Sequence, residues 1–428
     1  MRLTASLVWS LALCVAATAT AAQVISPLPL SPPAREGFSE ARLARIGDFI
    51  HRIVESGDYL GAVTLVSRNG MIVDWRAHGH RDLARKMPMT KDTIFRIYSM
   101  TKTVTSVAVL MLMEDGKLAL DDPVGKFMPQ FANIMVFSGG TLEAAQLRAP
   151  KQPITIRHLL THTGGFATRG EKDGVAGKLF NRIDLHQLPT LAAYANYVAQ
   201  QPLATDPGEQ FNYDGVSIEI ASRLVEVVSG MTFEAYLQQR ILVPLKMDDT
   251  GFSVPPAKRG RVADMVTTDK DGRLVIAATH DAAHPGEPLN PYPSGAGGLY
   301  STAGDYLRFC QMLLNGGSLD GVVILGRKTV ELMMMNHLAD ANVPEGALGK
   351  GEGFGLGGYV VVDVARRGRP GSIGQFGWSG AGSTYYTIDR QEKLIAMLLM
   401  QHLPQGLPRD PPKVSARFYS TVYQSLTR

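Results

Sequence analysis

The stretch Phe95-Arg-Ile-Tyr-Ser-Met-Thr-Lys102 stands directly before a long apolar run, Val104 to Met113. Apolar residues recur in this run at helical spacing, which predicts a buried helix with Ser99 in its first turn. Ser99 and Lys102 then lie on one face of the helix, where their side chains meet. A serine hydroxyl becomes a strong nucleophile when a neighbouring base takes its proton, and a lysine does so when burial keeps its amine neutral. The same residues also fit a serine N-cap followed by a solvated lysine, so other parts of the chain must decide.

The composition is that of a globular protein. Of the 428 residues, 45% are hydrophobic and 19% are charged, which suffices for a sizeable core and roughly two or three domains. The formal net charge is +4 without any block of Lys and Arg, so we expect no binding to nucleic acid.

The first residues, Met1 to Ala22, predict a secretory signal peptide. They combine a basic start at Arg2, an apolar core too short to span a bilayer, and small residues for cleavage near Ala21. We therefore expect a periplasmic or secreted protein with no integral membrane segment after the signal is removed. Removal of Cys14 leaves Cys310 alone, so we expect no intramolecular disulfide in the mature chain.

Strand patterns occur at both ends of the chain and helical patterns in the middle. Two apolar runs flank the turn Arg68-Asn-Gly70 and predict a hairpin, with a further strand within 75–82. Strand patterns return at 297–300, 358–362, 383–388 and 393–400, and residues 116–295 are mostly helical in pattern. We therefore expect an α+β fold, an antiparallel sheet flanked by helices with an inserted mostly helical domain. The predicted boundaries are 1–22 for the signal peptide, 23–36 for a proline-rich arm, 37–115 and 296–428 for a split sheet domain, and 116–295 for the helical domain, with the active site at their interface.

Two later motifs follow the serine–lysine pair in chain order. Tyr213-Asp-Gly215 stands before a helical pattern, and Gly377-Trp-Ser-Gly-Ala381 stands before a strand pattern. This order resembles that of the serine β-lactamase and penicillin-binding-protein superfamily, and within it the class C β-lactamase-like esterases known as family VIII carboxylesterases. Further stretches match signatures of the family, among them residues 120–124, 155–165, 244–250 and 297–303. The resemblance covers residues 37–426 and implies a β-lactamase/transpeptidase-like fold with a catalytic serine.

The resemblance implies a role for each residue of these motifs. Ser99 is the expected nucleophile, Lys102 the base beside it, and Tyr213 the group that relays a proton to the leaving alkoxide. The backbone N–H groups of Ser99 and Ala381 are expected to form the oxyanion hole. The residues expected in the substrate pocket are Trp378, Gly380 and Asp214.

Two departures from the family pattern bear on the substrate. The family usually has an asparagine two residues after the tyrosine, where this chain has Gly215, so a contact to a substrate amide is lost. Lactamases have a lysine in the third motif, and Trp378 stands there instead, as in the esterase branch. A lysine binds a substrate carboxylate, whereas an indole forms the wall of an apolar pocket. Arg96 or Arg157 offers a replacement cation from elsewhere in the chain.

The residues and the resemblance together indicate an exported serine hydrolase, a β-lactamase-like carboxylesterase that cleaves carboxylic esters through a serine acyl-enzyme. Its expected partner is a small-molecule ester, with no cofactor and no metal. Two alternatives stay open: a weak β-lactamase or D-amino-acid peptidase on the same scaffold, and a non-catalytic penicillin-binding-like interaction protein. The motifs also leave open the natural ester, the acyl length, hydrolysis against acyl transfer, residual β-lactamase activity and the oligomeric state.

Three sequence patterns imitate other sites. Residues 377–381 approach the Gly-x-Ser-x-Gly elbow of α/β-hydrolases, but the fifth residue is Ala381, and a strand pattern rather than a helix follows Ser379. The third motif of the family is His-x-Gly in many relatives, and the stretch His162-Thr-Gly164 imitates it but stands before the tyrosine loop. The pair His78-Gly-His80 has no third ligand nearby in the sequence, so we expect no metal there.

Overall fold

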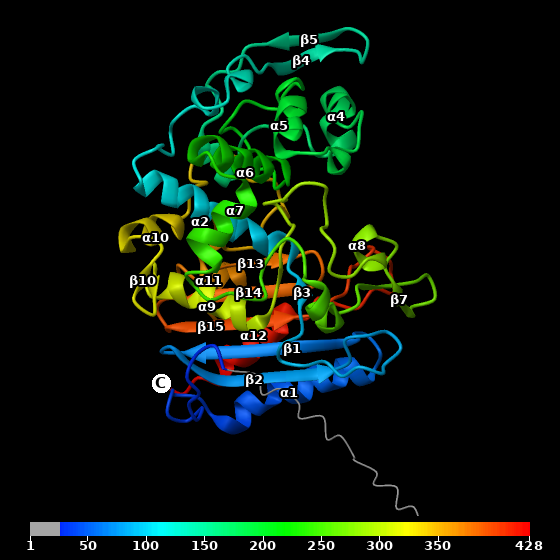
Figure 1. Cartoon of the computed structure of the whole chain (residues 1–428), viewed down its shortest axis with the longest axis vertical. Coiled ribbons are helices and arrows are strands. Elements are labelled where there is room, and N and C mark those ends of the chain that lie inside the picture. Colours follow the sequence, from blue (N-terminus) through cyan, green and yellow to red (C-terminus); the bar gives the residue numbers. More distant parts are fainter. Residues whose placement is uncertain (1–25) are drawn as a thin grey trace, which may run out of the picture.

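The computed structural model describes residues 26–428 and is built on a seven-stranded antiparallel sheet (Figure 1). The predicted signal peptide, 1–22, lies outside the described residues. Strands from the early and the late parts of the described chain are neighbours in this sheet, because β15 pairs with β14 on one side and with β1 on the other. The strands, in their order across the sheet, are β11 (Glu352–Phe354), β12 (Tyr359–Val361), β13 (Phe376–Gly380), β14 (Thr384–Asp389), β15 (Leu394–Leu399), β1 (Gly61–Arg68) and β2 (Met71–Gly79).

Two strand predictions need correction. The pattern within 75–82 does not form a third strand, because residues up to Gly79 continue β2 and pair with β1. The strand expected at 297–300 is the short β8 (Tyr300–Ser301), which pairs with β3 (Phe95–Arg96) outside the main sheet. The pairing of β3 with β8 holds the segment just before Ser99 against the segment that follows residues 116–295.

Helices cover both faces of the sheet, which explains why β1 is an almost continuous apolar run. Ala62 and Val66 of β1 pack in one core cluster with α1 (Glu40–Glu55) and α12 (Ser415–Gln424). Val63 and Leu65 point the other way, as successive residues of a strand do, and belong to the core that contains α2 (Thr101–Glu114) and α9 (Ala303–Leu314). A strand buried on both faces has no polar side to alternate with its apolar one.

Residues 116–295 form several short helices joined by long loops, and most of this region lies at the end of the molecule away from α1 (Figure 1). The division into a sheet domain and a helical domain stays a prediction. The helices here are α3 (Ile156–Leu160), α4 (Gly174–Phe180), α5 (Leu191–Ala199), α6 (Val216–Ser229), α7 (Phe233–Leu237) and α8 (His280–Ala283), with two hairpins, β4 (Val136–Gly140) with β5 (Ala145–Arg148) and β6 (Val266–Thr268) with β7 (Leu274–Ile276). The remaining elements, after α9, are β9 (Ser318–Leu319), β10 (Val322–Val323), α10 (Arg327–Met333) and α11 (Val364–Arg367).

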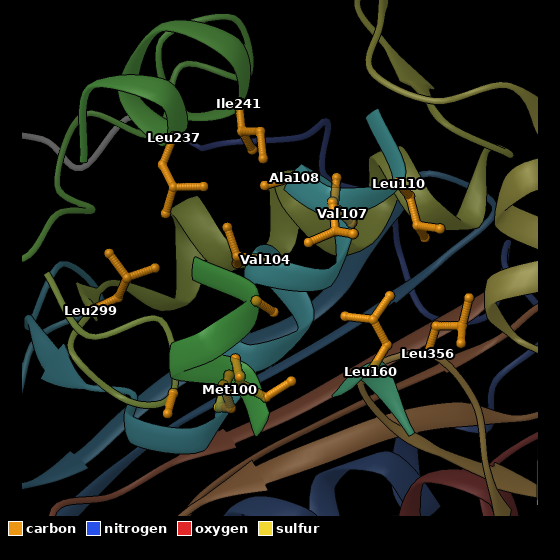
Figure 2. Close-up of a cluster of buried hydrophobic side chains, with 14 of the residues drawn as sticks. Met100, Val104, Val107, Ala108, Leu110, Leu160, Leu237, Ile241, Leu299 and Leu356 are labelled. Carbon is orange, nitrogen blue, oxygen red and sulfur yellow. The ribbon is translucent and has the colours of Figure 1, made fainter. Parts of the chain in front are cut away.

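The helix α2 lies at the centre of the protein, and every residue from Thr101 to Leu112 is buried. Figure 2 shows Val104, Val107 and Leu110 of this helix among apolar side chains of other elements, such as Leu160, Leu237 and Leu356. Each fully buried side chain of this size contributes about 1.5–3 kcal/mol, so the helix is held firmly from several sides. Within residues 26–428, no helix is both long and apolar enough to cross a bilayer.

Candidate active site

Ser99 lies in a single 3-10 turn, Tyr98–Met100, that leads directly into α2. Lys102 follows in the first turn of α2 and is buried, and its Nζ donates a hydrogen bond to Ser99 Oγ at 3.1 Å. The same amine donates a hydrogen bond to the carbonyl oxygen of Ala296 at 2.7 Å. The carbonyl therefore fixes the direction of the amine, and the amine is in place to exchange a proton with the serine.

The backbone just before the serine is strained. Tyr98 has a left-handed φ of 41°, which is uncommon for a residue with a Cβ and is frequent at functional sites. Its phenol donates a hydrogen bond to Asp281 Oδ2 at 2.8 Å, and burial raises the pKa of this phenol, so it stays a donor. Asp281 also forms an ion pair with the buried Arg96 at 2.9 Å. These contacts hold the turn and so determine where Ser99 points.

Tyr213 lies close to the amine of Lys102. Lys102 Nζ is 5.0 Å from the centroid of the phenol ring, and Trp378 Nε1 donates a hydrogen bond to the Tyr213 hydroxyl at 3.0 Å. The Tyr213 ring also packs on His162, with ring centroids 4.7 Å apart, and His162 in turn contacts Phe354. Ser99 and Lys102 from one predicted stretch and Tyr213 from another therefore lie close together in the structure.

Asp214, which was expected in the substrate pocket, is not among the residues that line the cavity at Ser99. Its carboxylate accepts hydrogen bonds from the backbone N–H of Ser217 at 2.6 Å and from the Ser217 hydroxyl at 3.1 Å, so it caps the start of α6. Its own backbone N–H points to Nδ1 of His162 at 3.4 Å. Burial lowers the pKa of His162, which keeps this ring neutral beneath Tyr213. Asp214 and His162 therefore stabilise the loop that carries Tyr213, the first by capping α6 and the second by packing on the Tyr213 ring.

A cavity of about 260 Å³ opens at Ser99. Trp378, Gly380 and Ala381 line this cavity together with Ser99, and their roles in an oxyanion hole and a substrate pocket stay predictions. A proline-rich loop contributes Pro404 and Pro411. The other lining residues are Tyr59, Tyr213, Ser379, Ser383, Tyr385, His402 and Lys413.

The two arginines considered as replacement cations do not line this cavity. Arg96 is buried against Asp281, and Arg157 forms an ion pair with Asp121 at 2.7 Å. Lys413, an exposed residue just before α12, is the only Lys or Arg among the lining residues. Among the residues that line the cavity, the positive charge available to a substrate is therefore that of Lys413, since Trp378 of the third motif carries none.

Comparison with known proteins decides the family. The profile of the Beta-lactamase family matches residues 46–416. The chain belongs to the β-lactamase family. It is 34% identical over 363 residues to Protein Rv1367c of Mycobacterium tuberculosis, a match that covers 83% of this chain and 89% of the relative. It is 28% identical over 400 residues to Esterase EstB of Burkholderia gladioli, covering 88% and 95% of the two chains.

Among solved structures, EstCE1, described as a hydrolase with promiscuous acyltransferase activity, superposes with a TM-score of 0.73 at 26% identity. The match covers 91% of this chain and 99% of that chain. The resemblance to the serine β-lactamase superfamily and the expected β-lactamase/transpeptidase-like α+β fold are therefore confirmed. The protein is a serine hydrolase of the β-lactamase family with esterases among its relatives.

The structure of this β-lactamase-family protein also bears on the elbow-like sequence at Ser379 and on possible metal ligands. Ser379 lies within β13 opposite Tyr385 of β14, so no helix follows it as an elbow requires. Of the described residues, His280, His284 and Glu287 bring three potential metal ligands within 4.8 Å of one another, and none of them lines the cavity at Ser99.

Sequence reasoning missed two groups next to the site, one that contacts Lys102 directly and one that contacts the neighbouring segment. One is the carbonyl of Ala296, which no side-chain pattern reveals because the contact is made by the backbone. The other is Glu219, which is fully buried on α6 and accepts a hydrogen bond from the neighbouring backbone N–H of Gly295 at 3.1 Å. A signal for Glu219 was available, since a lone charged residue stands among Ile218, Ile220 and Ala221 on a helix.

Proposed function

We propose that this protein is a carboxylesterase of the β-lactamase family with Ser99 as its nucleophile. The observation that carries the proposal is the 3.1 Å contact between Lys102 Nζ and Ser99 Oγ, beside a cavity that Trp378 also lines. A buried lysine at hydrogen-bond distance supports a nucleophilic serine, and an indole wall supports an apolar ester as the substrate. EstB, a relative over most of the chain, is itself named an esterase.

In the proposed acylation, Lys102 takes the proton of the Ser99 hydroxyl while Ser99 Oγ bonds to the carbonyl carbon of the ester. The carbonyl oxygen becomes an oxyanion, which the backbone N–H groups of Ser99 and Ala381 stabilise. The bond to the alcohol oxygen then breaks. The leaving alkoxide takes a proton from Tyr213, and the Lys102 ammonium returns one to Tyr213, so the acyl group remains on Ser99.

In the proposed deacylation, a water molecule replaces the alcohol and gives its proton to the same Tyr213 and Lys102 pair. The water oxygen attacks the acyl carbon, the acid is released, and Ser99 recovers its proton. A second alcohol in place of water would yield a new ester by the same steps. EstCE1 is described as having such an acyltransferase activity beside hydrolysis.

The proposed site of action is the periplasm or the outside of the cell. The support is the pattern of Met1 to Ala22, with its basic start, short apolar core and small residues at the expected cleavage point. Fractionation of cells that express the full chain, together with the N-terminal sequence of the mature protein, tests this part.

Hydrolysis of p-nitrophenyl butyrate by purified protein tests the activity. We expect turnover by the wild type, loss of more than 99% of kcat in Ser99→Ala, and near-normal kcat in the matched control Ser379→Ala. Circular dichroism should show that both variants are folded. Activity retained in Ser99→Ala and lost in Ser379→Ala would reject the assignment of the nucleophile.

A further inference from the structure

A fully buried carboxylate, Glu219, lies one contact away from the lysine of the proposed site. It is part of α6, and its carboxylate accepts hydrogen bonds from the hydroxyl of Ser294 and from the backbone N–H of Gly295, the latter at 3.1 Å. The backbone N–H of Ala296 also stabilises its ionised form. Burying a carboxylate costs stability unless several donors compensate it, and here the donors come from three consecutive residues.

The same three-residue segment carries the acceptor for Lys102. The carbonyl of Ala296 accepts the hydrogen bond from Lys102 Nζ at 2.7 Å, and the carbonyl of Gly295 accepts one from Thr105 Oγ1 at 2.8 Å. Lys102 and Thr105 belong to α2, whereas Glu219 belongs to α6. The segment is therefore held between two helices, with its N–H groups on Glu219 and its carbonyls on α2.

Packing leaves this segment little freedom. A Cβ at Gly295 would overlap the hydroxyl of Ser222 on α6, so only glycine allows the backbone to approach the helix this closely. A shift of the segment would carry the Ala296 carbonyl with it and turn the Lys102 amine away from Ser99 Oγ. Loss of alignment by about 1 Å is enough to lower a rate strongly.

We propose that the ionised carboxylate of Glu219 is a positioning residue for catalysis: it fixes residues 294–296, and through the Ala296 carbonyl it aims the Lys102 amine at Ser99. This inference rests on the proposed function of Ser99 and Lys102. The negative charge also favours the ammonium that forms when Lys102 takes the serine proton.

The groups around Glu219 give this role a pH dependence. Lys102 of α2, Tyr194 of α5 and Tyr292 of the preceding loop face it. Burial raises the pKa of Glu219 to about 7, and burial keeps both phenols protonated by raising their pKa values. Protonation of Glu219 below about pH 7 replaces an acceptor by a donor and removes the charge, so the rate should fall there.

The test is Glu219→Gln, which keeps the size of the side chain and can still accept from Gly295 while removing the charge. We expect kcat for p-nitrophenyl butyrate at pH 9 to fall about 10- to 100-fold with KM changed less than twofold. The acidic limb of its pH profile should move to lower pH, because the titrating group and its attraction for the ammonium are gone. The milder variant Ser294→Ala should show a smaller fall in kcat of the same kind.

The matched control is Asp305→Asn on α9. Asp305 also accepts from a backbone N–H, that of Asp249 at 2.8 Å, and from the Thr250 hydroxyl at 2.9 Å, and burial raises its pKa to about 6, but it does not line the cavity. It should alter stability without altering kcat or the pH profile. Normal kcat at pH 9 and an unmoved acidic limb in Glu219→Gln would overturn the inference. Full activity of Ser99→Ala in the same assay would instead overturn the proposed function, and the inference with it.

Discussion

The indole Nε1 of Trp378 donates a hydrogen bond to the phenolic oxygen of Tyr213 at 3.0 Å. Trp378 therefore does more than form an apolar wall, since it also contacts the group proposed to move the proton. A donated hydrogen bond stabilises negative charge on the phenolic oxygen.

Trp378→Phe should lower kcat for p-nitrophenyl butyrate about 2- to 10-fold, because it removes one hydrogen bond to Tyr213 and keeps most of the apolar surface. KM should change little. Steady-state kinetics check this, with Trp75→Phe as the control: Trp75 is buried in β2, and its Nε1 has no hydrogen-bond partner among the described residues. Equal kcat for Trp378→Phe and the wild type would show that the contact is unimportant for proton transfer.

Lys102→Met should lose far more in kcat than in KM, because the methionine fills the buried space but cannot accept the serine proton. General-base groups contribute roughly 10²–10⁴-fold, and we expect a loss in that range. Lys126→Met is the surface control, since Lys126 forms an exposed ion pair with Asp122 at 2.9 Å. A Lys102→Met protein with normal kcat and a raised KM would mean that the lysine binds substrate and does not act as the base.

The third motif should favour uncharged esters over β-lactams. Without a lysine at position 378 the carboxylate of a lactam loses a contact worth about 1.5–3 kcal/mol, whereas an acyl chain gains roughly 0.8 kcal/mol for each CH₂ buried. We expect kcat/KM for p-nitrophenyl butyrate to exceed that for nitrocefin by several orders of magnitude. Comparable values would show that Trp378 does not set the specificity.

Lys413 allows a separate check on any nitrocefin turnover. It is exposed and lines the cavity, so a salt bridge from it to a lactam carboxylate would contribute only about 0.2–1 kcal/mol. Lys413→Ala should therefore lower kcat/KM for nitrocefin by less than about sixfold and leave that for p-nitrophenyl butyrate unchanged. A much larger loss would make Lys413 the carboxylate site of this protein.

Glu219→Gln should become more stable relative to the wild type as the pH rises. Burial raises the pKa of Glu219 from 4.5 to about 7, so between these values the folded protein holds a proton that the unfolded chain has lost. The stability that this proton gives is complete below about pH 4.5 and is lost as the pH rises through 7. Urea unfolding at pH 5 and pH 8 should show the free energy of unfolding of the variant, relative to wild type, about 2 kcal/mol higher at pH 8. An identical difference at both pH values would exclude the raised pKa.

The elements with strong local signals could be predicted from the sequence. The apolar run after Lys102 forms α2, and Gly377 to Gly380 lie in β13 just before the turn to β14, with Trp378 in the cavity. Ser99 itself lies in a 3-10 turn before the helix proper, because Tyr98 adopts a left-handed conformation held by Asp281. That tether joins residues far apart in the chain, so no local pattern reveals it.

The missed features all depend on such distant contacts. Asp214 looks like a pocket residue beside Tyr213, but the start of α6 offers the unpaired N–H groups that its carboxylate caps. Lys413 lines the cavity at Ser99 together with Pro404 and Pro411 of the proline-rich loop, and Glu219 reaches the site through residues 294–296. The type of each residue was visible in the sequence, whereas its partner was not.

Labelling with a fluorophosphonate probe tests most directly whether Ser99 is the nucleophile. Its oxygen should attack phosphorus, expel fluoride and leave one phosphonyl group on each chain. Intact-mass measurement should show a single addition, peptide mapping should place it on Ser99, and Ser99→Ala should take up none. A label on Ser379, or ester hydrolysis with no label at Ser99, would contradict the proposed mechanism.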